Sequence, residues 1–337
     1  MATKAIPVVA AKVAATLADY PAYVKPSAMT GWGSLTLAQV ESMRWYSDSG
    51  LTTELASDPV SSDEIHVKVT SLTSSTTIYV DYDGVRSKYA VGATYGRNAV
   101  WSNYAMVLHA GGDTDSAGNI TLTANGGVVS GGATGNIGSA TSFDGSDDFF
   151  EMSSKGGIGA SGWTFQTWLN ATVASSQGCM VGLYDGSGAG GDIFLFKKNT
   201  STSFQLRSGH LSTNEFDVRP TGSLTEGTWA MQHASYDNAK ARWYSDGSLE
   251  STTSKIGSAD PFDDATIMRV GARTDNAQYF QGLLSELRIA DLVLSDDWIT
   301  TEYNNQDDVG TFWGTVTDAG GGVTANNSAR RQHLMMM

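Results

Sequence analysis

Short stretches in which apolar and polar residues alternate recur along most of the chain. In one of them, Ile65, Val67 and Val69 fall on one side of an extended backbone, and His66 and Lys68 fall on the other. A period of two is typical of a strand with one buried face. The strands expected from such patterns span residues 21–26, 65–72, 76–84, 163–173, 192–198, 203–209, 229–237, 241–247, 266–272 and 285–294.

Clusters of Gly, Asp, Ser and Asn separate these stretches and mark turns. Short strands joined by such turns indicate antiparallel β-sandwiches. The clearest helix signal lies in residues 295–306, where Ser295 is suited to cap the N-terminus and two aspartates follow it. The predicted fold class is therefore all-β. Two antiparallel sandwich domains are expected at residues 1–95 and 96–314, followed by a Gly-rich linker and C-terminal tail at residues 315–337.

Composition excludes several classes of protein. The formal net charge of −14 disfavours nucleic-acid binding, because the phosphate backbone is also anionic. The single cysteine, Cys179, allows no internal disulfide and no cysteine-based zinc site. No apolar run is long enough to span a membrane. Lys12 interrupts the first apolar stretch, so no secretory leader is predicted at the start of the sequence.

The second predicted domain carries several motifs in a row. They are "GNIGSATSFDGSDDFFEMS" at residues 135–153, "GWTFQTWLNA" at residues 162–171 and, as the longest, "YFQGLLSELRIADLVLSDDWITTEYNNQ" at residues 279–306. In these motifs the region from about residue 100 to residue 312 resembles the concanavalin A-like, laminin-G-like jelly-roll family. One position departs from the family pattern, because Ser285 stands where an aspartate usually precedes Glu286.

The first predicted domain carries "LADYPAYVK" at residues 17–25, "SMRWYSDSGLTTELA" at residues 42–56 and "DEIHVKVTSLTSSTTIYVDYDG" at residues 63–84. It resembles a small β domain of unknown function that often precedes this jelly roll in bacterial and phage proteins. An acidic motif that usually follows the second stretch in that family is missing here. The two resemblances imply the fold directly and the function only indirectly, because jelly rolls host unrelated activities.

The stretch "GSATSFDGSDDFFEM", residues 138–152, has two interpretations. It turns one core strand into the next as a hairpin, with Phe143 and Phe149 facing the core, or it is part of a calcium site. Calcium prefers several oxygen ligands, which acidic turns supply. The candidate calcium ligands are Asp113, Asp115, Asp144 and Asp147. Ser285 removes one acidic contributor and counts against calcium, and no other cofactor is expected.

No catalytic residue is predicted. Glucanases with this fold carry Glu-x-Asp-x-x-Glu on one strand, and the nearest match, Glu215 and Asp217, has Pro220 in place of the last acid. Residues 186–191 match G-x-G-x-x-G, but a strand pattern follows instead of a helix, so a hairpin loop is expected. The histidines show no metal-ligand spacing and are expected to be solvated or hydrogen-bonded within strands: His66, His109, His210, His233 and His333.

Aromatic residues next to turns are the candidates for glycan binding. Sugar rings stack on exposed aromatic side chains that have polar neighbours. Tyr184, Trp243 and Tyr244 lie beside Gly-rich or Asp-Gly turns and are predicted to contact glycans. The tryptophans inside the family motifs are expected in the core: Trp163, Trp168, Trp229 and Trp298.

The predicted function is that of a non-enzymatic bacteriophage virion protein, such as a capsid decoration, fibre or tail component that binds host glycans. The alternative is a secreted bacterial carbohydrate-binding module or adhesin at the cell surface. The C-terminal tail is expected to dock on other virion proteins or on another copy in a homo-oligomer. Its apolar and basic side chains would make these contacts: Arg330, Arg331, Leu334, Met335, Met336 and Met337.

Overall fold

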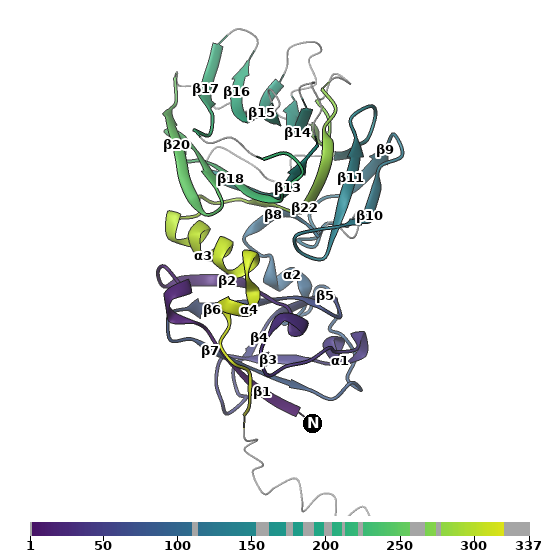
Figure 1. Ribbon diagram of the computed structural model, residues 1–337, viewed down its shortest axis with the longest axis vertical. Helices are drawn as coiled ribbons and strands as arrows, with labels where there is room; N and C mark the ends of the chain where they lie inside the picture. Colours follow the sequence, from purple (N-terminus) through teal and green to yellow (C-terminus); the bar gives the residue numbers. More distant parts are fainter. Residues whose placement is uncertain are drawn as a thin grey trace, which may run out of the picture.

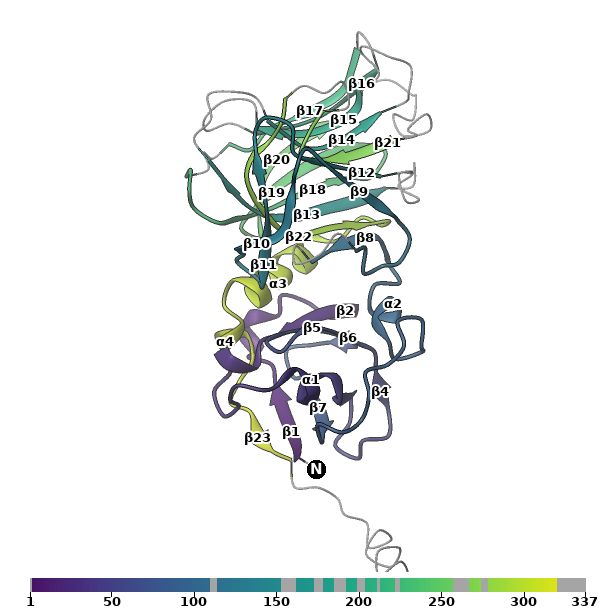
Figure 2. The same ribbon diagram turned by 90° about the vertical axis from the view of Figure 1, so that its right-hand side faces the viewer.

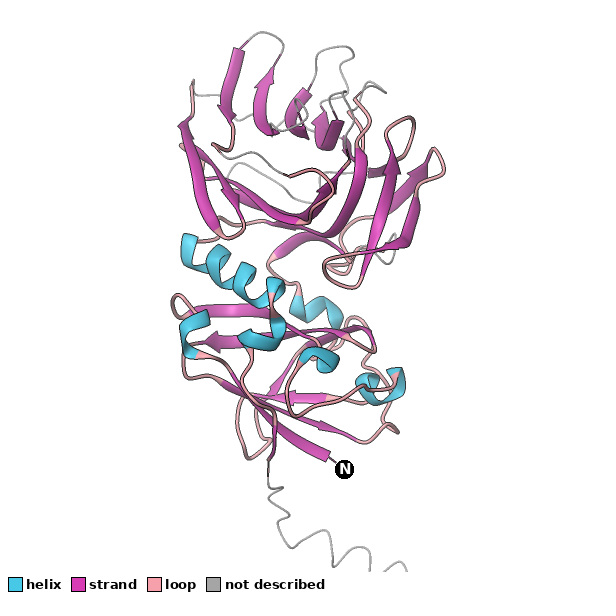
Figure 3. Cartoon of the chain, viewed as in Figure 1, coloured by secondary structure: helices cyan, strands magenta, loops and turns pink. Residues whose placement is uncertain are grey.

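The computed structural model describes two β domains stacked along the long axis of the molecule, with helix α3 (Asp296–Asp307) between them (Figure 1, Figure 2). Both domains are built from antiparallel sheets, which confirms the predicted all-β class (Figure 3). No helix in the described part of the chain is long and apolar enough to cross a membrane. The described residues are 2–109, 114–152, 162–172, 178–184, 192–198, 204–210, 213–221, 225–256, 267–273 and 278–319.

The first domain packs a five-stranded sheet against a three-stranded sheet. The five-stranded sheet has the order β23 (Thr317–Asp318), β1 (Ala2–Pro7), β7 (Thr77–Tyr82), β3 (Arg44–Tyr46) and β4 (Glu54–Leu55). The three-stranded sheet has the order β2 (Leu17–Val24), β6 (Glu64–Leu72) and β5 (Ser57–Ser61). The short helices around them are η1 (Ala10–Lys12), η2 (Pro26–Ala28), α1 (Leu37–Glu41) and α2 (Arg97–Val100). The alternation read in residues 65–69 is that of β6.

The end of the described chain returns to the first domain. Helix α4 (Val309–Phe312) and the residues after it contribute Phe312, Trp313 and Val316 to the core that also holds Ile6 and Trp45. Strand β23 then pairs with β1. The predicted start of the linker, at residue 315, is therefore too early in the sequence, because residues 315–319 complete the first domain. This domain is discontinuous in sequence, since both ends of the described chain supply strands to one sheet.

The second domain is a sandwich of an eight-stranded and a seven-stranded sheet. The eight-stranded sheet has the order β10 (Val129–Thr134), β11 (Ser139–Asp144), β22 (Gln281–Ala290), β13 (Trp163–Ala171), β18 (Ala230–Tyr236), β19 (Lys240–Ser245) and β20 (Ser248–Ser254), with β8 (Tyr104–Leu108) also on β22. The seven-stranded sheet has the order β17 (Thr213–Val218), β16 (Phe204–His210), β15 (Asp192–Lys198), β14 (Gly178–Tyr184), β21 (Ile267–Val270), β12 (Phe149–Met152) and β9 (Leu122–Asn125).

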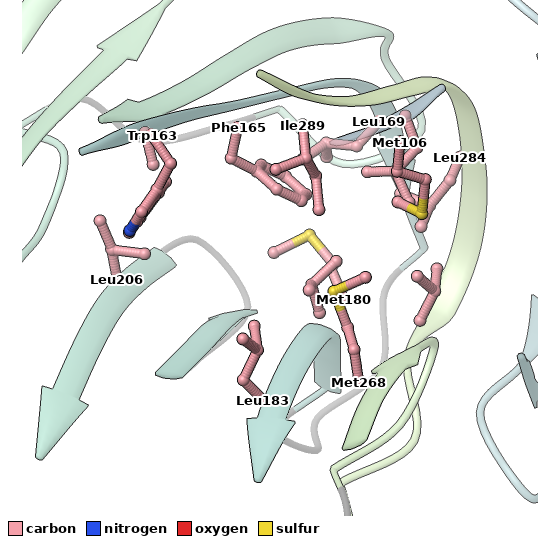
Figure 4. Packing of buried hydrophobic residues seen from close by; sticks show 14 of the residues in the cluster. Met106, Trp163, Phe165, Leu169, Met180, Leu183, Leu206, Met268, Leu284 and Ile289 are labelled. Carbon is pink, nitrogen blue, oxygen red and sulfur yellow. The ribbon is translucent and has the colours of Figure 1, made fainter. Parts of the chain in front are cut away.

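Apolar side chains from the facing sides of these two sheets fill the core of the second domain. Phe165 and Ile289 of the eight-stranded sheet lie opposite Met180 and Met268 of the seven-stranded sheet (Figure 4). Each strand points every second residue inward. The core therefore follows from the alternation that the sequence shows.

The stretch at residues 138–152 is not a hairpin. It joins β11 of the eight-stranded sheet to β12 of the seven-stranded sheet, so it crosses from one layer to the other. Phe143 and Phe150 are buried in the core, whereas Phe149 is half-buried on the opposite side of β12. The expectation that Phe149 faces the core is therefore wrong, because the pairing register of β12 places its neighbour Phe150 inward.

Helix α3 joins the two domains. Ser295 caps it by accepting a hydrogen bond from the backbone N–H of Trp298, as predicted. On one side, the Asn305 side chain accepts from the Tyr23 N–H at 2.7 Å and donates to the Tyr23 carbonyl at 3.0 Å. On the other side, Gln306 Oε1 accepts from the Trp168 indole of β13 at 2.8 Å. The helix is therefore hydrogen-bonded to both domains.

Candidate functional site

A group of buried charged side chains lies where the two domains meet. The first domain contributes two neighbouring strands, β5 and β6, and the second contributes β22, α3 and the residue that follows β8. All the members are at least nine-tenths buried. We call them the interdomain ion cluster: Asp58, Glu64, His66, His109, Glu286, Arg288 and Glu302.

The imidazole of His109 lies between two carboxylates. Its Nδ1 is 2.7 Å from Glu286 Oε1, and its Nε2 is 3.1 Å from Asp58 Oδ2. Burial lowers the pKa of His109, but the charge of Glu286 and the hydrogen bonds to both carboxylates raise it to about 10. Burial raises the pKa of Asp58, yet the hydrogen bond and charge of His109 hold it below its usual value. His109 is thus an imidazolium ion between two carboxylates.

Arg288 links this ion to helix α3. Its Nη2 and Nε donate to Glu286 Oε2 at 2.6 and 3.1 Å, and its Nη1 donates to Glu302 Oε1 at 2.9 Å. The guanidinium also lies over the Trp101 ring, 4.9 Å from its centroid. Burial lowers the pKa of Arg288, but the two carboxylates raise it above its usual value. The cluster therefore alternates negative and positive groups from β5 to α3.

A bulge in β22 directs Glu286 into the cluster. Opposite β13, Ser285 pairs with Trp168 and Arg288 pairs with Gln166, so β22 has one extra residue in this interval. Glu286 takes up the irregularity with a φ of 52°, a conformation that L residues other than glycine rarely adopt. Strained backbone of this kind concentrates at functional sites. The bulge lets Glu286 and Arg288 both face the first domain while Leu287 faces the jelly-roll core.

Glu64 and Glu286 differ in protonation. Burial and the charge of Glu286 raise the pKa of Glu64 to about 8. Burial acts in the same direction on Glu286, but the positive charges of His109 and Arg288 keep its pKa well below the usual value. Two buried carboxyl groups that share one site ionise one at a time. Glu64 therefore carries a proton at neutral pH, and Glu286 does not.

His66 lies at the centre of the cluster. Its Nδ1 is 3.5 Å from Arg288 Nη2, and a guanidinium only donates, so this nitrogen accepts and Nε2 carries the hydrogen. Nε2 is 3.7 Å from Glu64 Oε1 and 3.8 Å from Glu286 Oε2, and it has no hydrogen-bond partner. Burial and the nearby charge of Arg288 lower the pKa of His66 well below its usual value. The ring is therefore neutral.

Two glutamates and two histidines form a donor set that suits a transition metal, and their ligand atoms lie within 4.8 Å of one another. Coordination through His66 Nε2 would need a lone pair there, which the hydrogen bond from Arg288 to Nδ1 disfavours. The rings of His66 and His109 also stack, with centroids 4.8 Å apart and planes 15° apart, so their nitrogens do not converge. The geometry fits a proton-sharing ion cluster better than a metal centre.

Glu64 should make stability depend on pH. The unfolded chain releases this proton near the usual pKa of 4.5, whereas the folded chain keeps it to about 8, so its contribution to the free energy of unfolding falls as pH rises between these values. The slope for one proton is at most about 1.4 kcal/mol per pH unit. The side chain of Glu64→Gln cannot titrate. In urea unfolding, the free energy of unfolding of this variant should therefore rise relative to that of the wild type as pH increases across this range.

Glu41→Gln, at the end of α1, is the matched control for that experiment. His109 also contributes to the free energy of unfolding, because its pKa is raised in the folded protein. That contribution is fully present below the pKa of His109 in the unfolded chain and is lost as pH rises toward about 10. Glu41→Gln leaves this contribution unchanged, and Glu64→Gln keeps a neutral group 3.5 Å from His109, like the protonated Glu64 of the wild type. If Glu64→Gln and wild type change in parallel from pH 5 to 8, Glu64 is not protonated in the folded state.

The predicted calcium ligands do not form one group. The Asp115 carboxylate is buried and accepts hydrogen bonds from the backbone N–H groups of Val107, Ala117, Asn119 and Ile120. It therefore organises its own loop. Asp144 and Asp147 are exposed and lie together with Asp148, within 4.8 Å of one another. Asp113 lies outside the described residues.

Two of the three predicted glycan-binding aromatics, Trp243 and Tyr244, are buried. Trp243 is fully buried in the jelly-roll core, where its indole donates to Gln232 Oε1 at 2.8 Å. Tyr244 is also buried, and its hydroxyl donates to Asp296 Oδ1 at 2.7 Å. The expectation that these two side chains lie at a loop surface is wrong, because both belong to strand β19 and other parts of the chain cover them. The side chain of Tyr184 lies outside the described residues.

A different surface carries partly exposed aromatic and polar groups. We call it the distal face: it is the side of the seven-stranded sheet that points away from the jelly-roll core, at the end of the molecule opposite the first domain (Figure 1). Arg269 donates twice to Glu151, at 2.9 and 2.7 Å, and lies over the half-buried Phe149 ring at 4.5 Å. Asp217 accepts from Gln205 at 2.8 Å farther along the sheet.

Sequence reasoning missed the interdomain ion cluster. His66 and His109 are far apart in sequence and lack metal-ligand spacing, and Glu286 belongs to a family motif without an assigned role. A usable signal was the spacing of Leu284, Leu287 and Ile289, which breaks the period of two and indicates a bulge. The docking residues Arg330, Arg331, Leu334, Met335, Met336 and Met337 lie outside the described residues.

Comparison with known proteins supports the fold of the second domain. Residues 144–300 match the family model Laminin_G_3, described as the concanavalin A-like lectin/glucanases superfamily. This part of the chain is therefore a concanavalin A-like jelly-roll domain. No curated protein sequence matches the chain significantly.

Solved structures of low sequence identity match part of the chain. Domain 4 of an extracellular arabinanase from Geobacillus stearothermophilus, solved with arabinotriose, is 19% identical, with a TM-score of 0.48 over 59% of this chain and 97% of that chain. The receptor-binding domain of the botulinum neurotoxin C/D mosaic serotype is 12% identical, with a TM-score of 0.47 over 61% of this chain. The binding domain of botulinum neurotoxin serotype D is 11% identical, with a TM-score of 0.49. Each match covers 52% of the toxin domain, about half its length.

Proposed function

We propose that this chain is a non-catalytic glycan-binding protein whose distal face contacts carbohydrate. The observation that carries the proposal is the unequal covering of the two sheets. Trp168 and Met231, on the outer side of the eight-stranded sheet, are buried in the same cluster as Tyr20 and Trp313 of the first domain. The first domain and α3 thus cover that sheet, while the distal face points away from both (Figure 2).

The chemistry of the distal face suits sugars. A half-exposed aromatic ring can stack on the C–H face of a sugar, and neighbouring charged and amide groups can bind its hydroxyls. Phe149 and Tyr279 supply two rings whose centroids are 6.4 Å apart, and Arg269 and Glu151 lie beside them. These residues replace Trp243 and Tyr244 as the candidate contacts.

Glycan-array binding of the purified protein tests this proposal. Phe149→Ala and Tyr279→Ala should each weaken binding about fivefold, as expected for losing about 1 kcal/mol of stacking. Tyr89→Ala is the matched control, because Tyr89 also lies under a guanidinium, that of Arg44 at 3.9 Å, but in the first domain. Equal binding by all three variants and the wild type, or no binding to any glycan, would overturn the proposal.

The biological setting that we propose is a bacteriophage particle, in which the chain contacts other virion proteins or further copies of itself. The order of a small β domain before a jelly roll supports this setting. The alternative is a secreted bacterial carbohydrate-binding module. Mass spectrometry of purified particles distinguishes the two, because a virion protein must be present in them at a fixed stoichiometry.

Calcium binding is a separate proposal, which now depends on Asp144 and Asp147 without Asp115. Backbone N–H groups of Ser146 and Asp147 hydrogen-bond to the Asp144 carboxylate and lower its pKa, so it is ionised and able to bind a cation. A ligand at a hundredfold excess over its dissociation constant stabilises a protein by about 2.7 kcal/mol. Thermal melting in calcium and in EDTA measures this effect, and equal midpoints would contradict it.

A further inference from the structure

A cavity of about 390 Å³ opens beside the interdomain ion cluster. The first domain supplies one wall through β5, β6, the segment before α2 and the start of α2, and the second supplies the other through the loops around β8 and β11. The volume is enough for a single sugar-sized molecule. The lining residues used below are Ser61, Glu64, Lys88, Arg97, Ser116 and Ser139.

Two cations line this cavity without a carboxylate partner. Among the described residues, neither Lys88 nor Arg97 forms an ion pair. Lys88 is exposed, and its Nζ donates to the Pro59 carbonyl at 2.7 Å, a neutral acceptor. Arg97 Nε is buried and has no hydrogen-bond acceptor. A buried donor without an acceptor is uncommon in folded proteins, so Arg97 Nε marks a place where a ligand or water is expected.

The acidic residues of the cavity do not compensate these cations. Asp58 is occupied by His109 at 3.1 Å and by the Trp101 indole at 2.9 Å. Glu64 is only 5% exposed, and its Oε1 lies against the ion cluster, 3.5 Å from His109 Nδ1 and 3.7 Å from His66 Nε2. Because Glu64 is protonated at neutral pH, it adds no negative charge to the cavity. The cavity therefore has a lining with two positive charges that no carboxylate of the described residues pairs with.

We propose that this cavity binds a small organic anion, a carboxylate on a hydroxylated ring such as a uronic acid. The guanidinium of Arg97 and the ammonium of Lys88 would bind the carboxylate, since charge-assisted hydrogen bonds are the strongest contacts available there. The hydroxyls of Ser61, Ser116 and Ser139 would bind the ring hydroxyls. The site is separate from the distal face, so each can be tested without the other.

Isothermal titration calorimetry with sodium glucuronate tests the proposal, with glucose and inorganic phosphate as the comparison ligands. The wild type should bind glucuronate and not glucose at the same concentration. Arg97→Gln should weaken binding at least about tenfold, as expected for one charge-assisted hydrogen bond, and Arg97→Lys should retain part of it. Lys240→Gln, which removes an exposed positive charge from β19, should bind like the wild type.

The distal-face variant Phe149→Ala should also bind glucuronate normally, so failure of one site is distinguishable from failure of the other. Imidazole NMR signals of His109 provide a second readout in the wild-type protein, because this ring lines the same cavity. The proposal would be overturned if glucuronate produced no heat of binding in calorimetry and no change in the chemical shifts of the His109 imidazole. Phosphate binding as tight as glucuronate, with the same loss in Arg97→Gln, would also overturn it and assign the site to an inorganic anion.

Discussion

Arg288→Met is expected to lower the free energy of unfolding by about 3–5 kcal/mol, the usual cost of removing one partner from a buried ion pair. Arg288 is 1% exposed and pairs with Glu286 at 2.6 Å and Glu302 at 2.9 Å. Without the guanidinium, two carboxylates from different elements would stay buried with less positive charge between them. Urea unfolding at pH 7 measures the change.

Arg242→Met is the matched control, because Arg242 forms an equally short pair with Asp237, at 2.7 Å, but on a partly exposed surface. Exposed ion pairs contribute about 0–1 kcal/mol, so this variant should remain close to the wild type. A loss below 1 kcal/mol in Arg288→Met would show that the ion cluster contributes little to joining the domains. Separate unfolding of the two domains in the variant would show that the cluster couples them.

Trp313→Ala is expected to lower the free energy of unfolding by about 3–5 kcal/mol, as for other buried aromatic residues cut to alanine. Trp313 is 2% exposed, and its indole donates to the Tyr23 carbonyl at 2.9 Å. It packs edge-on against Phe312 and fills the core of the first domain from the far end of the sequence. Loss of the side chain leaves a cavity and removes one of the two side-chain hydrogen bonds to the Tyr23 carbonyl, which Asn305 still contacts at 3.0 Å.

Two truncations provide the matched comparison for this prediction. A chain that ends after Ala319 keeps β23 and should retain the melting temperature of the full chain. A chain that ends after Asp308 loses α4 and β23, and proteolysis should then cut within the first domain while the jelly roll stays intact. Equal protease resistance of the two truncated chains would contradict the view that the C-terminal segment completes the first domain.

The second domain could be predicted from local sequence because its strands carry their own signals. Each strand of the sandwich alternates inward and outward residues, and turn residues separate the strands. Strand β13 and helix α3 lie where residues 163–173 and 295–306 predict them. The strand that returns to the first domain, β23, could not be predicted, because it is only two residues long and forms by pairing with β1.

The pairing register of the strands decided which of two adjacent residues faces the core, a choice that the alternation of apolar and polar residues did not make. Phe149 and Phe150 are adjacent aromatic residues, and either could face the core as far as the sequence is concerned. The pairing of Phe150 with Val270 in β21 fixed the choice. Trp243 and Tyr244 were also misplaced, because residues beside a turn can still belong to a strand that another layer covers.

The sequence by itself determined the class of fold, about half of the strands of the jelly roll and the capped helix at residues 295–306, because these depend on patterns among residues close in the chain. Only the tertiary structure decided the candidate site. Glu64 and His66 reach His109 and Glu286 because two domains meet there and a bulge at Glu286 redirects one side chain. Burial and charge then set their protonation, and these depend on neighbours that no local pattern specifies.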